Sequence, residues 1–168
     1  MKKTRSIFAI LAAAMVFSLT ATAQTSLTST TGSKVDIEGQ KGKVVVLAIG
    51  ASWLPLSGKQ AEYTNALAKK YAGKNVLIYF VATDSTSAKS KNFASNDDLT
   101  AFATKNKLTV PILRDSDGAA TLKKFEVDQV PSFVVLDKNG KISGSPFGGI
   151  DPKFDVTVPI SKEIDKLL

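Results

Sequence analysis

The stretch KVVVLAIGASWLPLSGKQ (residues 43–60) changes character in its middle. Its first part, KVVVLAI (43–49), is a continuous run of apolar and β-branched residues, which is typical of a central strand covered on both faces. Helical spacing begins directly after SWLPLSG (52–58). The chain is therefore expected to turn from strand to helix at this corner, where a tryptophan is followed by Leu-Pro-Leu-Ser.

A second apolar and aromatic run, NVLIYFVAT (75–83), predicts the next strand. Between the two runs, apolar and small residues recur at helical spacing, and Gly73 is the expected C-cap. The residues at that spacing are Ala61, Thr64, Leu67, Ala68 and Tyr71. A strand, a helix and a strand in this order predict a βαβ unit.

The next part of the chain predicts two more helices around a short extended segment. After a polar loop, a helix is expected over 97–105, capped by Ser95 or Asn96. VPIL (110–113) is the extended segment, and DGAATLKKFEV (117–127) indicates a third helix.

The carboxyl-terminal part predicts a hairpin and a closing helix. SFVVLD (132–137) and KISGS (141–145) flank an Asn-Gly pair at 139–140, which is a strong hairpin signal. VPISKEIDKLL (158–168) indicates a helix with Pro159 in its first turn. Its inward residues are Ile160, Ile164 and Leu167. These elements predict a three-layer α/β domain with a mixed sheet.

The amino-terminal residues, MKKTRSIFAILAAAMVFSLTATAQ, combine a basic start, an apolar run over 7–19 and an Ala-Thr-Ala site at 21–23. This is the pattern of a secretory signal peptide. We expect residues 1–23 to be removed by cleavage after Ala23, which leaves one exported domain, 24–168, that is periplasmic or secreted. The apolar run is short for a bilayer, so no membrane span is expected after cleavage; a retained amino-terminal anchor is the alternative.

Charge and composition exclude several classes of function. The net charge is +7, of which the basic start contributes three, and the remaining lysines are scattered rather than clustered, so nucleic acid is not expected as a partner. The chain has no cysteine and no histidine. Zinc sites built on those residues and Cys-His or Ser-His catalytic pairs are therefore excluded.

Four segments in this order resemble the TlpA-type thioredoxin-like (redoxin, AhpC-TSA superfamily) family over nearly the whole expected domain, from about Leu27 to Leu168. They are GKVVVLAIGASWLPLSGKQ, LTVPILRDSDG, FEVDQVPSFVVLDKNGKI and FGG. The resemblance implies a thioredoxin-like three-layer α/β/α sandwich with a mixed sheet. It also implies export, which agrees with the signal peptide.

In that family the corner reads W-C-x-x-C, with a nucleophilic and a resolving cysteine. The resemblance places Leu54 and Ser57 at these two positions and keeps Trp53. Ala48 stands where the family often carries an acidic or amide residue. The Val130-Pro131 step is also kept, and in the family this bond is cis and faces the active site.

Thiol-disulfide exchange needs an attacking thiolate and a second thiol that resolves the mixed disulfide. Leu54 offers no nucleophile, and the hydroxyl of Ser57 does not ionise near neutral pH without a strong base beside it. Lys59 is the nearest lysine, but residues two apart at a helix start do not face each other. We therefore expect no thiol-disulfide activity of the chain's own, and no cofactor or metal.

The resemblance suggests what the corner can still do, because in the family the backbone before the cis proline pairs with an extended substrate. Our hypothesis is a non-catalytic site for an extended, partly apolar polypeptide or an envelope protein partner. Its residues are Trp53, Leu54, Pro55, Leu56, Val130 and Pro131. Two alternatives remain: a decayed site whose leucines pack down and touch nothing, and an accessory component of an oxidoreductase system whose partner supplies the cysteines. The oligomeric state is left open.

Three smaller motifs favour structural roles. The segment 115–118 has the start of a calcium loop but lacks the later ligand positions, so Asp117 is expected as a helix cap. The same explanation applies to 96–98. Residues 147–149 are expected to form a turn under the closing helix.

Overall fold

The computed structural model describes residues 24–168, so the expected signal peptide over 1–23 lies outside the described residues. These residues form a seven-stranded sheet with the order β2-β1-β5-β4-β3-β6-β7. The strands are β1 (Ser26–Ser29), β2 (Lys34–Asp36), β3 (Val44–Gly50), β4 (Val76–Ala82), β5 (Ile112–Arg114), β6 (Ser132–Leu136) and β7 (Phe147–Gly148). The pairs β3-β4 and β4-β5 are parallel and the other pairs are antiparallel. The α/β fold with a mixed sheet is therefore confirmed.

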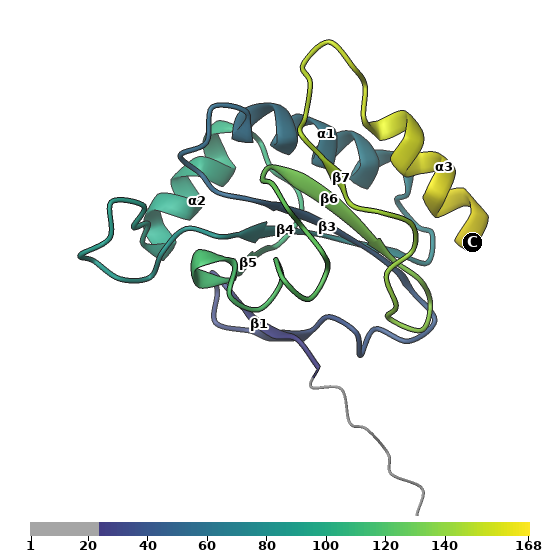
Figure 1. Cartoon of the computed structure of the whole chain (residues 1–168), viewed down its shortest axis with the longest axis horizontal. Coiled ribbons are helices and arrows are strands. Elements are labelled where there is room, and N and C mark those ends of the chain that lie inside the picture. The colour runs from purple at the N-terminus through teal and green to yellow at the C-terminus, as the bar shows by residue number, and fades with distance from the viewer. Residues whose placement is uncertain (1–23) are drawn as a thin grey trace, which may run out of the picture.

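The helices α1 (Ser57–Lys70), α2 (Asn96–Lys105) and α3 (Thr157–Leu167) pack on one face of the sheet (Figure 1). Every residue of β3 is buried, because alternate side chains enter two different cores. Val44, Val46 and Ala48 join the core beneath the helices. Val45, Leu47 and Ile49 join the core on the other face. This arrangement explains the uninterrupted apolar run in the sequence.

The second face is covered by the irregular segment 115–131, where the helix expected over 117–127 is wrong. The segment starts with a short 3₁₀ turn, Ser116–Gly118, and continues as turns. Asp117 (φ 57°) and Gly118 (φ 69°) have left-handed backbone conformations, which an α-helix does not accommodate. Phe125 and Val127 still supply apolar side chains to the second core.

The cap expected at Asp117 is also wrong, because the neighbouring Asp115 caps this segment. The buried carboxylate of Asp115 accepts hydrogen bonds from the backbone N–H groups of Ala120 and Thr121, both at 2.9 Å. It also accepts one from the Thr121 hydroxyl at 2.6 Å. These bonds give partners to two backbone amides in the turns that follow Ser116–Gly118.

Two other helix ends compare the caps expected from the sequence with those in the structure. Ser95 caps α2, and it forms a capping box with Asp98, as one of the two expected alternatives. The C-cap of α1 is Tyr71, whose N–H donates to the carbonyl of Leu67, and not Gly73. Gly73 (φ 75°) lies in the turn that follows.

The hairpin after β6 forms at the expected Asn-Gly pair, with the Gly140 N–H donating to the Asp137 carbonyl at 2.9 Å. The returning strand expected over 141–145 is wrong, because only Ile142 bridges to β6 there. Regular pairing resumes at β7, so residues 147–148 form a strand and not the expected turn. Pro146 precedes β7 and has no N–H to donate, which delays the ladder.

The closing helix α3 agrees with its sequence pattern. Pro159 lies in its first turn, Ile160 and Ile164 are fully buried, and Leu167 packs against the same core. The amino-terminal strands β1 and β2 were not expected, and they extend the sheet beyond β5. In the part of the chain that the structure describes, no helix is both long enough and apolar enough to cross a membrane.

Candidate functional site

The corner between β3 and α1 exposes some of its apolar residues and buries others. The indole of Trp53 is 54% exposed, and Pro55 is exposed as well. Leu54 is half-buried, and Leu56 is half-buried against the core beneath the helices. The exposed part of the corner is therefore Trp53 and Pro55, while Leu56 also serves the packing of the domain.

Ser57, the first residue of α1, is buried and turned into the corner. Its hydroxyl donates to the carbonyl oxygens of Leu54 at 2.6 Å and Ser52 at 3.1 Å. Lys59 does not approach it: the Lys59 ammonium contacts the Glu62 carboxylate at 2.9 Å, and this hydrogen bond raises the pKa of Lys59. Ser57 and Lys59 therefore have different hydrogen-bond partners.

A buried carboxylate that sequence reasoning missed holds the corner in place. Asp84, just past the end of β4, is fully buried. It accepts the Ser52 hydroxyl at 2.5 Å and the Ser52 backbone N–H at 3.0 Å. The signal in the sequence was a polar Thr-Asp pair immediately after an apolar strand, at the carboxyl edge of parallel strands where loops meet.

Gln60 is a second missed residue, and it links the corner to the next strand. It is fully buried on α1, and its amide Nε2 donates to the carbonyls of Ile49 and Ser132, both at 3.0 Å. The close approach requires a glycine at position 50, since a Cβ there would lie 2.2 Å from Gln60 Oε1. Helical spacing alone marks this position as buried but says nothing of its partners.

The Val130-Pro131 bond is cis, as the resemblance implied. Ile49 of β3 lies opposite Ser132 of β6 in an antiparallel pair, so the residues after Ile49 and those before Ser132 lie at the same end of the sheet. Pro131 is buried, and Val130 is half-buried against the second core. Within residues 24–168, the backbone N–H and carbonyl of Val130 have no hydrogen-bond partner.

Two hollows flank β7 beside this backbone, and Gly148 lines both. One, of about 390 Å³, opens on the helix side and is mostly apolar. It is lined by Phe147, Gly148, Gly149, Ile150, Asp151, Phe154, Val156 and Pro159. The other, of about 410 Å³, is polar. It is lined by Glu126, Asp128, Gln129, Ser132, Ser145, Pro146 and Gly148.

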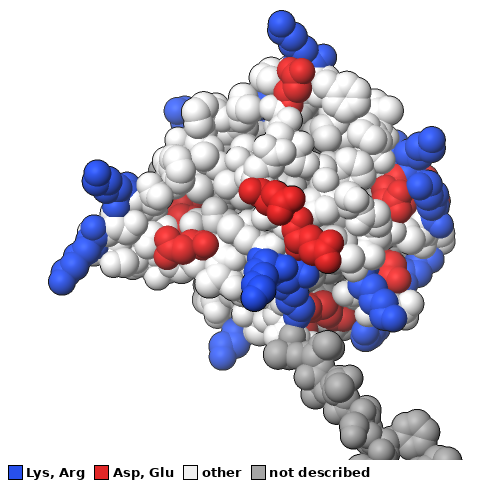
Figure 2. Space-filling model, in the orientation of Figure 1, with Lys and Arg blue, Asp and Glu red and all other residues white. Residues whose placement is uncertain are grey.

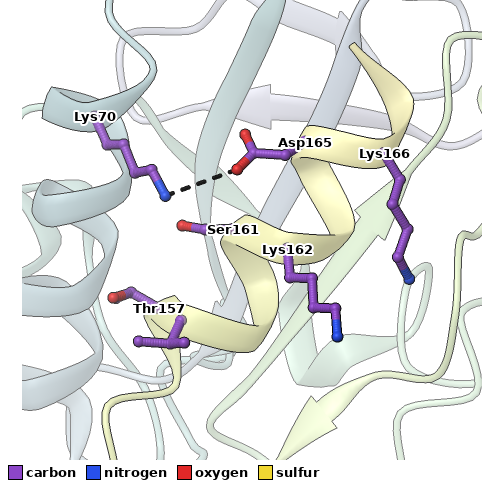
Figure 3. Close-up of a pocket in the computed structure, with 7 residues that line it drawn as sticks. Lys70, Thr157, Ser161, Lys162, Asp165 and Lys166 are labelled. Carbon is purple, nitrogen blue, oxygen red and sulfur yellow. Dashed lines mark ion pairs between the residues drawn. The ribbon is translucent and has the colours of Figure 1, made fainter.

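A further hollow, of about 540 Å³, lies between α1 and α3 (Figure 3). Lys70, the last residue of α1, points across it toward Asp165, with 3.9 Å between Nζ and the carboxylate. Both side chains are about half exposed, so the pair is solvated. This hollow lies at the opposite end of α1 from the corner, and none of the predicted site residues lines it.

Among residues 24–168, no group of three or more histidine, cysteine or carboxylate side chains is placed to hold a metal ion. The corner itself presents hydrogen-bonding groups and apolar side chains. The structure brings Trp53 and Leu54 to the same end of the sheet as Val130 and Pro131. It adds Asp84, Gln60 and the two hollows beside β7, which the sequence did not indicate.

Known proteins resemble this chain in sequence and in structure. The thiol-disulfide oxidoreductase ResA of Bacillus thuringiensis subsp. konkukian is 30% identical over 116 residues, which are 69% of this chain and 61% of the relative. The thioredoxin-like protein YneN of Bacillus subtilis is 31% identical over 128 residues, which are 76% of this chain and 70% of the relative. The chain thus spans less than two thirds of the ResA relatives.

A Chlorobium tepidum structure assigned as thiol:disulfide interchange protein DsbE matches the fold with a TM-score of 0.69 and 21% identity. The match covers 86% of this chain and 93% of that one. The profile of the family described as Redoxin matches residues 17–157. The chain therefore belongs to the Redoxin family and is similar to thioredoxin-like proteins, although it carries no cysteine.

Proposed function

We propose that this protein is an exported, non-catalytic module that binds an extended, partly apolar polypeptide or partner protein without covalent capture. The observation that carries the proposal is the unpaired backbone of Val130, which lies at the same end of the sheet as the exposed Trp53. A peptide that runs along Val130 gains backbone hydrogen bonds, as in strand addition. Trp53 and the apolar hollow then supply contacts for its side chains.

The lack of thiol chemistry follows from the residues at the corner. In our proposal, Leu54 and Ser57 occupy the two positions where the family carries cysteine. Leu54 has no nucleophilic atom, and the Ser57 hydroxyl donates hydrogen bonds to backbone carbonyls of the corner. With no cysteine anywhere in the chain, neither a mixed disulfide nor its resolution is possible.

Export belongs to the same proposal. The pattern of residues 1–23 supports a cleaved signal peptide, with 24–168 as the mature domain in the periplasm or outside the cell. Amino-terminal sequencing of the protein from the envelope fraction tests this. A mature chain that starts at Gln24 supports cleavage after Ala23, and an intact Met1 refutes it.

Peptide binding is tested with the tryptophan as a probe, because Trp53 is the single tryptophan of the chain. Titration with a short, unstructured peptide of alternating leucine and serine should change Trp53 fluorescence saturably. An otherwise identical peptide N-methylated at its central amide should bind about tenfold more weakly or worse, because it cannot pair with the Val130 carbonyl.

The matched variants are Trp53→Ala and Phe93→Ala, followed by anisotropy of a labelled peptide. Both side chains are substantially exposed, but Phe93 lies in the loop before α2, outside the proposed site. Trp53→Ala should weaken binding, and Phe93→Ala should leave it unchanged. Absence of binding to the wild type, or equal loss in both variants, contradicts the proposed site and favours a decayed corner.

A second candidate is an accessory role in a thiol-disulfide oxidoreductase system, which the names of the ResA relatives favour. In that case a partner supplies the cysteines and this chain supplies recognition. An insulin-reduction assay with dithiothreitol, run on the wild type and on Leu54→Cys/Ser57→Cys, tests whether the corner can still place two cysteines for thiol-disulfide exchange. Activity in the variant alone supports that geometry, and turnover by the wild type overturns the non-catalytic proposal.

A further inference from the structure

The polar hollow beside β7 has an acidic lining. Glu126 and Asp128 are exposed on its wall, and its lining residues include no lysine or arginine. Within residues 24–168, neither carboxylate forms an ion pair. Figure 2 shows acidic side chains near the middle of one face, with basic side chains directly beside them and around the rim. The carboxylates of Glu126 and Asp128 are the charged groups of the lining itself. More distant charges act on the hollow weakly, because charges beyond about 8 Å are largely screened at physiological salt.

A second feature of the same hollow points to a ligand. Ser132 lines it and is fully buried, yet its hydroxyl has no hydrogen-bond partner among the described residues. Buried hydroxyls are normally paired, since an unpaired one loses the hydrogen bonds it makes with water. A donor group that entered the hollow would supply the missing partner.

Strand geometry determines which side chains of a bound peptide could reach this hollow. Val134 and Leu136 of β6 face the core away from the helices, and Ser132 is on their side by alternation. The apolar hollow, by contrast, includes Ile150 and Val156 of the core beneath the helices. Successive side chains of an extended peptide point to opposite sides. A peptide at Val130 therefore sends one side chain toward the acidic hollow and its two neighbours toward the apolar one.

We propose that the acidic hollow receives a lysine or arginine side chain of the bound polypeptide, which makes the preferred sequence apolar-basic-apolar. This proposal rests on the proposed function and specifies its ligand. The cationic group approaches Glu126 and Asp128 and donates to the Ser132 hydroxyl. The residues before and after it contact the apolar hollow and Trp53.

The test compares three peptides that differ at one position. Each is a capped, serine-rich peptide with the central triplet Leu-X-Leu, where X is lysine, norleucine or glutamate. Norleucine has the same length of hydrocarbon chain as lysine without its charge. The lysine peptide should bind about tenfold more tightly than the norleucine peptide, and the glutamate peptide should bind most weakly, because charge-assisted hydrogen bonds are strong. The lysine preference should shrink as salt is added.

Variants locate the source of the preference. Glu126→Gln/Asp128→Asn should remove the preference for lysine and leave the affinity for the norleucine peptide unchanged. Asp97→Asn, the same chemical change at an exposed residue of α2, should keep the preference.

Each outcome decides one of the two proposals. Equal, measurable binding of the lysine and norleucine peptides overturns the basic-residue proposal and leaves peptide binding standing. A preference lost equally in Asp97→Asn assigns it to the overall charge and also overturns this proposal. Binding of none of the peptides overturns the proposed function itself.

Discussion

The corner at residues 51–57 and the segment 126–132 lie at the same end of the sheet but differ in how their polar groups are satisfied. In the corner, the Ser52 hydroxyl and N–H bind the buried Asp84, and the Ser57 hydroxyl binds backbone carbonyls. In the segment, the Val130 backbone and the Ser132 hydroxyl have no partner within the described residues. The first region is built to hold its shape, whereas the second leaves groups available for a ligand.

This difference shows that, in this thioredoxin-like fold, the shape of the corner does not depend on the cysteines that give the corner its chemistry in the family. The corner keeps its shape without cysteine because internal hydrogen bonds from Asp84 and Ser57 support it. In our proposal, recognition depends on the neighbouring segment, where the Val130 backbone has no hydrogen-bond partner within residues 24–168. Four measurements test this difference between the two regions, beginning with the residue that connects them.

Gln60→Ala should have the largest effect. The change removes hydrogen bonds to Ile49 and Ser132 and leaves a cavity between the two regions, so we expect a loss of about 3 kcal/mol in the free energy of unfolding. Chemical denaturation measures it. The control is Gln40→Ala, which removes a single, partly exposed bond to the Asp36 carbonyl and should cost under about 1 kcal/mol. Equal losses would mean that Gln60 does not couple the regions.

Ser52→Ala should cost about 2 kcal/mol, because it takes a charge-assisted hydrogen bond from the buried Asp84 carboxylate. Ser57→Ala removes a neutral bond in the same corner and should cost about 1 kcal/mol. Thermal unfolding of both variants gives the comparison. If Ser57→Ala is the more damaging change, Asp84 is not the anchor of the corner.

Ser132→Ala should stabilise the free protein by up to about 1 kcal/mol, since it removes a buried hydroxyl that lacks a partner. The same change should reduce the preference for the lysine peptide. Denaturation in the absence of ligand measures the first effect. A loss of stability as large as that of Ser57→Ala would show that the hydroxyl is already satisfied in the free protein.

The smallest effect concerns the ion pair between Glu38 and Lys124, which fastens the segment 115–131 to the amino-terminal part of the domain. Burial raises the pKa of Glu38, but the Lys124 contact and the Thr25 N–H outweigh it and hold the pKa below its ordinary value of 4.5. The charged form therefore stabilises the fold above pH 4.5, and this contribution is lost as the pH falls through the lowered pKa.

Glu38→Gln should accordingly reduce stability by about 1 kcal/mol or less at neutral pH, and the difference from wild type should vanish in acid. Unfolding free energies measured across the acid range provide the test. A difference that persists unchanged in acid would assign the effect to packing rather than to charge.

The sequence predicted the elements whose signals are local and strong. The apolar runs of β3 and β4, the capping box at Ser95 and the helical spacing of α3 all appear in the structure. The helix expected over 117–127 failed because Asp117 and Gly118 adopt left-handed conformations, which its apolar spacing does not reveal. The strand expected over 141–145 failed because regular pairing resumes only at β7.

The candidate site was predictable only in outline. The corner followed from the change from an apolar run to helical spacing, and the cis Val130-Pro131 bond came from the resemblance to a known family; the structure contains both. Asp84 and Gln60 were missed, because their partners lie far from them in sequence. The hollows beside β7 were missed for the same reason, since residues 126–132 and 145–148 meet there only after folding.

The absence of thiol chemistry can be read from the amino-acid sequence, because a chain without cysteine has no thiolate and no thiol to resolve a disulfide. The strand-helix-strand core can be read from it too, since apolar runs and helical spacing are properties of neighbouring residues. Which polar groups remain available becomes clear only in the folded domain. That outcome depends on the register of β3 against β6 and of β6 against β7, which unites distant residues at one end of the sheet.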